Sequence, residues 1–146
     1  MGLGLAGLAG VLCHAQSSLA DAVYFAEIGF GDTISRQVIT TTLPASTTEL
    51  LVPLAGSDPR GVALDVAGGK IYYAFGTSIG RANLDGTSPE TVISGLAGGV
   101  GDIELNPFTG TLYFAVSSGT SADRSISRVQ TDGEAGAVGL DAADAA

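Results

Sequence analysis

The chain has 146 residues, an ordinary length for one domain and enough to bury a hydrophobic core. Its 45% hydrophobic and 14% charged residues exclude an intrinsically disordered chain, and its 22 glycines indicate many tight turns between short strands. The net charge of −9, from 15 acidic and 6 basic residues, argues against nucleic acid or an anionic membrane as the partner, because both are bound through clustered Lys and Arg.

Residues 1–22 differ in composition from the rest of the chain and are predicted to be a secretory signal peptide. The first twenty residues contain no charged side chain, and residues 2–15 are almost wholly apolar or small. This apolar stretch is shorter than the about 20 residues that span a bilayer. Small residues allow cleavage after Ala15, Ala20 or Ala22, with the last two favoured. The alternative is a buried N-terminal strand or helix. We expect an exported protein, secreted, periplasmic or at the cell surface, with no membrane anchor after cleavage.

The predicted leader also contains the only cysteine, Cys13, and the only histidine, His14. Once both are removed, the chain has no Ser-His-Asp triad, no Cys nucleophile, no His general base and no ordinary zinc site. The D-x-D-x-D-G ladder of a Ca²⁺ loop is also absent from the sequence. The sequence therefore predicts no catalytic, cofactor-binding or metal-binding residue, and calcium is the one ligand of this kind that the acidic composition leaves open.

Three similar phrases recur along the chain, starting near Val23, Ile71 and Leu112. Each reads aliphatic residue, Tyr, aromatic residue, Ala, and each is followed by Ile-x-Arg. The second and third phrases start 112 − 71 = 41 residues apart, and the first and second 71 − 23 = 48 residues apart. A repeat of this length is typical of β-propellers, in which each unit is one four-stranded blade. We expect the repeat units to occupy residues 23–133.

The clearest repeat unit predicts four strands joined by tight turns. Its β-branched and aromatic residues place the strands at residues 62–66, 70–75, 78–84 and 90–94. Asp65 begins an Asx turn that ends at Gly69, Asp85-Gly86 forms the last turn, and residues 95–101 cross to the next unit. No stretch beyond the leader shows a 3.6-residue apolar period, so we expect essentially no helix.

The best-matching unit, Gly61 to Gly86, contains the pattern G-[VI]-A-L-D-x-x-x-G-K-[IL]-Y-[WYF], followed by I-x-R-A-N-L-D-G. This pattern resembles the YWTD repeat of the low-density lipoprotein receptor class, and it is also similar to the wider six-bladed group that includes the NHL-repeat proteins. Residues 102–133 match next best. Residues 22–36 are a diverged copy, in which the Thr/Ser stretch 41–50 replaces the Asp-Gly turn. Ala replaces the Thr of the family pattern in every copy, so the resemblance does not imply the receptors' ligand contacts.

The resemblance implies an all-β fold of four-stranded antiparallel blades in an incomplete ring of about two to three blades. Six blades of about 41 residues would need about 250 residues. Residues 134–146 form an acidic, Ala-rich tail that does not match a blade. Three explanations stay open: a fragment of a longer propeller, a short chain that completes its ring by self-association, and an open stack of sheets.

One arginine and one tyrosine recur in every unit: Arg36, Arg81 and Arg128, with Tyr24, Tyr72 and Tyr113. A functional residue in every blade would be unusual, so we interpret the arginines as partners in strand-to-strand ion pairs or hydrogen bonds. The tyrosines are predicted to pack between blades, with their hydroxyl groups bonded to buried partners.

Asp102 and Glu104 lie two residues apart on one predicted strand and therefore point to the same face. The pair could hold a metal or act as acid and base, but a solvated face is the favoured interpretation. Asn106 is predicted to begin an Asx turn like that of Asp65. The Ser/Thr-rich stretches 39–48 and 117–125 are predicted to be loops, which are the parts of propellers that bind ligands.

The sequence therefore predicts an exported, non-catalytic propeller-type module that binds a protein or carbohydrate ligand and is a fragment of a longer propeller. The alternative is part of a six-bladed enzyme of the Ca²⁺-dependent lactonase type, which rests on fold analogy alone.

Overall fold

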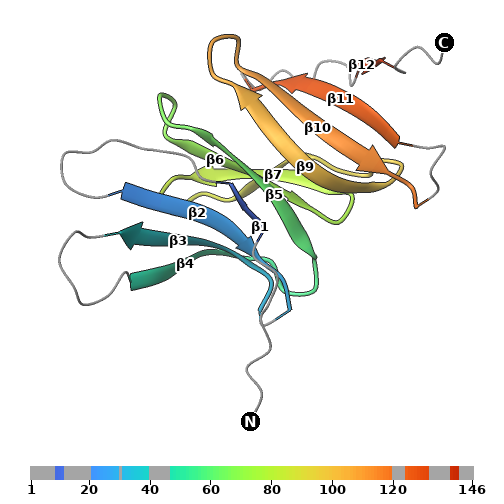
Figure 1. Ribbon diagram of the computed structural model, residues 1–146. Helices are drawn as coiled ribbons and strands as arrows, with labels where there is room; N and C mark the ends of the chain where they lie inside the picture. The colour runs from blue at the N-terminus through green and yellow to red at the C-terminus, as the bar shows by residue number, and fades with distance from the viewer. Residues whose placement is uncertain are drawn as a thin grey trace.

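The computed structural model describes residues 9–11, 21–29, 31–39, 47–119, 124–131 and 139–141. Within these ranges the chain consists of strands, turns and connecting segments, without a helix. The strands form three four-stranded sheets in which each strand pairs with its neighbours in the chain in antiparallel fashion (Figure 1). The expected all-β architecture, an incomplete ring of propeller blades, is confirmed. We number the sheets as blades 1 to 3.

Blade 1 contains β1 (Ala9–Val11), β2 (Asp21–Glu27), β3 (Thr33–Ile39) and β4 (Thr47–Pro53). Blade 2 contains β5 (Pro59–Asp65), β6 (Lys70–Phe75), β7 (Ser78–Asn83) and β8 (Glu90–Ile93). Blade 3 contains β9 (Gly99–Asn106), β10 (Thr111–Ser117), β11 (Arg124–Gln130) and β12 (Gly139–Asp141). Blade 2 lies between blades 1 and 3 (Figure 1), and its first strand, β5, contacts both β1 and β9.

Two strands begin three residues earlier than predicted, whereas the other predicted bounds of blade 2 differ by at most one residue. The strand predicted to start at Val62 begins at Pro59, and Gly99 to Gly101, predicted as part of a crossing segment, begin β9. The reason is pairing between strands: Gly99 lies opposite Ser117 of β10, beyond a register shift in the same ladder. Glycine readily adopts extended backbone angles, so a partner strand can extend a ladder into a segment whose own composition indicates a loop.

Strand β1 lies inside the predicted leader and occupies the first position of blade 1. Val11 is opposite Tyr24 on β2, as Ala63 is opposite Tyr72 in blade 2. The leader itself stays a prediction, and residues 1–8 and 12–20 lie outside the described residues. In the predicted tail, Gly139–Asp141 forms β12 and pairs with β11, since a backbone ladder requires no particular side chains.

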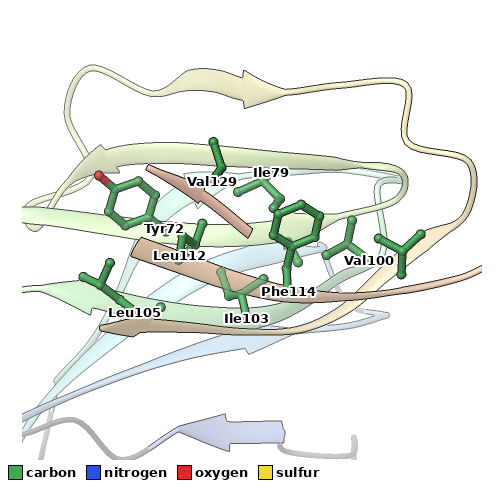
Figure 2. Packing of buried hydrophobic residues seen from close by; sticks show 11 residues of the cluster. Tyr72, Ile79, Val100, Ile103, Leu105, Leu112, Phe114 and Val129 are labelled. Atoms are coloured by element: carbon green, nitrogen blue, oxygen red, sulfur yellow. The ribbon is translucent and has the colours of Figure 1, made fainter. Parts of the chain in front are cut away.

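Each blade has two faces, because successive side chains of a strand point in opposite directions. We call the face with the repeat tyrosine the head face, and the opposite face the tail face. The head face of blade 1 packs on the tail face of blade 2 through a cluster of Tyr24, Ala26, Ile34, Val52, Val62, Leu64, Ile71, Tyr73 and Ala82. The head face of blade 2 packs in the same way on the tail face of blade 3 (Figure 2), through Ala63, Tyr72, Ala74, Ile79, Val100, Ile103, Leu105, Leu112, Phe114, Val116 and Val129.

Strands β6 and β10 place the same repeat phrase in different surroundings. All four residues from Ile71 to Ala74 are buried, because blade 2 is covered on both faces. In β10, Leu112 and Phe114 are buried whereas Tyr113 between them is exposed. This alternation is that of a sheet with one packed face, so the head face of blade 3 is open within the described part of the chain.

Candidate functional site

The repeat arginine and tyrosine of blade 1 bind the neighbouring blade. The hydroxyl group of Tyr24 and Nη1 of Arg36 each donate a hydrogen bond to the backbone carbonyl oxygen of Leu84, both at 3.3 Å. Arg36 also forms an ion pair with Glu49 on β4, and its guanidinium lies 6.0 Å from the centre of the Tyr24 ring. Leu84 precedes the Asp-Gly turn of blade 2, so one carbonyl group receives both donors of blade 1.

Blade 2 repeats this arrangement against blade 3. Nη1 of Arg81 donates to the backbone carbonyl oxygen of Thr131 at 3.0 Å, while Nε and Nη2 donate to Oε1 of Glu90 at 2.8 and 2.6 Å. The guanidinium lies 6.0 Å from the centre of the Tyr72 ring. Interaction with Tyr72, and then with Glu90, raises the pKa of Arg81, so the guanidinium stays charged in the interface. The predicted strand-to-strand ion pairs are thus confirmed for Arg36 and Arg81 but not for Arg128, which forms no ion pair with a described residue; the bond to the next blade is an additional role.

The third copy of this arrangement is open, and it is the candidate site. Tyr113 is 38% exposed, whereas Tyr24 and Tyr72 are 4% and 1% exposed. Ile126 is 58% exposed, although Ile34, its counterpart in blade 1, is fully buried. The predicted packing of the tyrosines between blades is confirmed for two of them and is wrong for Tyr113, because no described sheet covers blade 3 on this side.

A shallow hollow of about 170 Å³ lies on this open head face, lined by Asp102, Ile103, Glu104, Tyr113, Phe114, Ala115 and Ile126. Asp102 and Glu104 are both exposed on β9, on either side of buried Ile103, as their spacing predicts. The register places Glu104, Tyr113 and Arg128 in one row across three strands. The face thus presents acids at the β9 side, an apolar centre, and a base at the β11 side.

Exposed Ile126 and the hollow beside it were not identified from the sequence as a site. The Ile-x-Arg repeat marks the position, but the repeat phrase is the same in all three copies and does not show which copy is left uncovered by another described sheet. Within the described ranges, no three His, Cys, Asp or Glu side chains come together in a way that could hold a metal ion.

A second hollow, of about 340 Å³, lies between blades 2 and 3 and is lined by Asp58, Arg60, Gly76, Gly99, Gly101, Ala115, Ser117 and Gly119. Nε and Nη2 of Arg60 donate to Oδ2 of Asp58 at 3.1 and 2.6 Å. The only two charged residues in this lining therefore pair with each other, and the pair is solvent-exposed.

The turn residues have the predicted structural roles. Oδ1 of Asp65 accepts a hydrogen bond from the backbone N–H of Gly68 at 2.8 Å, and Oδ1 of Asn106 accepts one from Phe108 at 3.0 Å. Oδ1 of Asp85 accepts hydrogen bonds from the hydroxyl group of Thr87 at 2.6 Å and from its backbone N–H at 3.0 Å. These bonds lower the pKa of Asp85 below its ordinary value, the hydroxyl contributing most.

The two Ser/Thr-rich stretches are not loops throughout. Strand β4 begins at Thr47 and β11 begins at Arg124, so strand pairing reaches into both predicted loops. The rest of both stretches and the predicted turn Asp132-Gly133 lie largely outside the described residues. The described part of the chain also has no helix of the length and apolar character needed to cross a membrane.

No family model matches the chain, and no curated protein matches it. Among solved structures, a chain in the crystal structure of a nidogen/laminin complex is similar, with a TM-score of 0.63 at 24% sequence identity. The similarity covers 77% of this chain and 41% of that chain, so the present chain spans less than half of the neighbour's length. At this identity the likeness shows the fold, and it agrees with an incomplete propeller-like arrangement of blades.

Proposed function

We propose that this chain is an exported, non-catalytic, propeller-type module that binds a partner protein through the head face of blade 3. One observation carries the proposal: the repeat tyrosine and isoleucine are buried under the next blade in blades 1 and 2, whereas Tyr113 and Ile126 are exposed. A repeat unit buries its apolar face only against a neighbour. The exposed head face of blade 3 therefore supports the binding of a partner there. The neighbour in the nidogen/laminin complex supports a protein, rather than a carbohydrate, as the class of partner.

The YWTD-type assignment of the blades is part of the proposal. It rests on the pattern in residues 61–86, and the likeness in fold to the neighbouring chain supports it. Export rests on the composition of residues 1–22, and the non-catalytic role rests on the placement of Cys13 and His14 within that predicted leader.

The prediction that the chain is a fragment of a longer propeller is an alternative to this binding function, because a fourth blade would cover the head face of blade 3. Three blades are half of the about six that the resemblance implies, and the match covers 41% of the neighbour's chain. The nucleotide sequence downstream of the codon for Ala146 tests it directly: further units with the Tyr-aromatic-Ala and Ile-x-Arg pattern would establish it.

Selection from a random-peptide display library tests the binding function. We expect the immobilised chain to retain peptides that are lost when Ile126→Ser removes the exposed isoleucine of the open face. Leu50→Ser is the matched control, because Leu50 is 72% exposed on β4, away from this face, and its loss should leave retention unchanged. A selection that yields no peptide dependent on Ile126 would contradict the proposed function.

Two further measurements test the export and the lack of catalysis. N-terminal sequencing of the chain recovered outside a secreting host should show cleavage after Ala20 or Ala22; an intact chain retained in the cell would contradict export. The purified chain should not hydrolyse lactones or esters with or without Ca²⁺, and calcium should leave its melting temperature unchanged. Calcium-dependent turnover would favour the lactonase-type alternative.

A further inference from the structure

The contact between blades 2 and 3 requires a small residue on β5. A Cβ atom added to Gly61 would lie 2.8 Å from the backbone nitrogen of Ile103 and 2.9 Å from the carbonyl oxygen of Gly101. Contacts this short to backbone atoms cannot be relieved by rotating a side chain. The first strands of blades 2 and 3, β5 and β9, can therefore approach closely because position 61 has no side chain. Ala63, the next residue on this face, is also small and is buried in the cluster between the blades.

Blade 3 differs from blade 2 at these same two positions. With the repeat offset of 41, Asp102 takes the place of Gly61 and Glu104 takes the place of Ala63. In blade 1 the register places Ala9 and Val11 there, again without a charge. A fourth blade stacked at the spacing of blade 3 on blade 2 would meet the Asp102 side chain where the backbone of β9 meets Gly61. It would also bury two carboxylates, which is costly unless bases pair with them.

Within its described part, a second copy of this chain has no unengaged base to offer apart from Arg128. Four of its six basic residues are engaged within the chain: Arg36 with Glu49, Arg60 with Asp58, Arg81 with Glu90, and Lys70 with Oδ1 of Asn83 at 2.6 Å. Of the other two, Arg128 belongs to the open face itself, and the side chain of Arg124 lies outside the described residues.

The surface that a second copy would present is the tail face of its blade 1. The register puts Val23, Phe25 and Glu27 of β2 on this face, opposite Gln37, Ser35 and Thr33 of β3. Glu27 is acidic, and no base is found among these residues. Phe25 is already buried, at 7% exposure, whereas Leu50 of β4, which the register places opposite Ser35 on this face, is 72% exposed. The face therefore has apolar surface but no base for Asp102 and Glu104, and this lack of a base disfavours closing the ring with another copy.

We propose that the head face of blade 3 docks a basic, apolar-flanked segment of a different protein. A Lys or Arg of that segment pairs with Asp102 and Glu104, and a neighbouring aliphatic side chain fills the hollow beside Tyr113 and Ile126. Arg128 donates a hydrogen bond to a backbone carbonyl oxygen of the segment. Arg36 and Arg81 donate such bonds to the carbonyl oxygens of Leu84 and Thr131. This inference rests on the proposed function and adds the chemistry of the partner to it.

Charge complementarity favours a basic segment over an acidic one as the occupant of the open face. The open face has two acids on β9 and one base on β11, separated by Tyr113 on β10, and Arg128 forms no ion pair with a described residue. Neighbouring strands are about 4.8 Å apart, so a segment lying across the sheet can reach both ends of this row. A base at its β9 end and a free carbonyl group at its β11 end match the face, whereas an acidic segment is repelled by Asp102 and Glu104.

The test uses the full chain and three synthetic nonapeptides that share one aliphatic sequence and differ at two alternate central positions, which are both Lys, both Gln or both Glu. Titration followed through the methyl resonances of Ile126 should show the Lys peptide binding about tenfold more tightly than the Gln peptide, and the Glu peptide not binding. The preference should weaken as salt is raised. In the Glu104→Gln variant the advantage of the Lys peptide should fall, and in D102N/E104Q it should vanish.

Asp58→Asn is the matched control, because it removes one acid from the other hollow without changing the head face. It should leave the Lys preference intact, and all variants should keep the melting temperature of the parent chain to show that they are folded. Equal binding of the Lys and Gln peptides, equal effects of Asp58→Asn and Glu104→Gln, or binding of no peptide would overturn the inference. So would a concentration-dependent dimer abolished by Ile126→Ser, or a downstream sequence that encodes a fourth blade.

The proposed function can fail separately from this inference. If the selected peptides depend on Ile126 but contain no Lys or Arg, the proposed protein binding stands and the proposed basic segment is wrong. If the library yields no peptide that depends on Ile126, the proposed binding function itself is contradicted.

Discussion

The guanidinium group of Arg81 donates a hydrogen bond of 3.0 Å to the backbone carbonyl oxygen of Thr131 and thereby joins blade 2 to blade 3. The same side chain is held from the other side by Glu90 of its own blade. The repeat arginine therefore links two blades, and its effect on stability should depend on whether a next blade is present.

Replacing Arg81 by Ala should reduce the free energy of unfolding by about 1–3 kcal/mol, because the Thr131 carbonyl group loses its charged donor and Glu90 loses its partner. Chemical denaturation followed by circular dichroism measures the change. Arg128→Ala is the control in the same repeat position and should cost less than about 0.5 kcal/mol, since Arg128 is exposed. Equal losses in the two variants would show that the bond to Thr131 adds nothing.

Tyr72 and Tyr113 provide a second matched pair. Tyr72→Ala should lower the free energy of unfolding by about 3–5 kcal/mol, because it empties a site that is 1% exposed. Tyr113→Ala removes the same side chain from an open face and should cost under about 1 kcal/mol. Thermal and urea denaturation of both variants measure the difference. A Tyr113→Ala loss as large as that of Tyr72→Ala would mean that the head face of blade 3 is covered in solution.

Gly61→Ala should destabilise the contact between β5 and β9 by about 1–3 kcal/mol, because the new methyl group would overlap backbone atoms of Ile103 and Gly101. Gly101→Ala is the control: a Cβ there has no atom within 4 Å, and the change should be nearly neutral. The comparison again requires only denaturation curves. If Gly61→Ala proved neutral, the close approach of the two strands would not be required for blade stacking.

The Asp85 turn gives a prediction on pH. Because hydrogen bonds from Thr87 lower the pKa of Asp85 in the folded chain, the carboxylate stabilises the fold above its unfolded pKa, and this contribution is lost as the pH falls through the folded pKa. Thr87→Val removes the hydroxyl donor, so the pKa of Asp85 should rise toward its ordinary value in an NMR titration. Thr91→Val, a change at an exposed threonine of β8, should leave it unmoved; a shift in both variants would rule out the local cause.

The sequence by itself determined the four-stranded antiparallel blade and much of its local structure. Strand β6 has the predicted bounds, Lys70–Phe75, and the Asx turns at Asp65 and Asn106 form as predicted. These features follow from alternation of side chains and from turn chemistry, which act between residues close together in the chain.

Only the tertiary structure decided which copy of the repeat is covered. Tyr72 and Tyr113 belong to the same phrase, and their different exposure depends on whether another sheet stacks on the blade. The bond from Arg81 to Thr131 likewise joins residues 50 positions apart. The repeat pattern indicates which side chains each blade can bury. Which face stays open for a partner depends on the packing of sheets that are distant in the chain, because burial depends on the neighbouring sheet as well as on the residue itself.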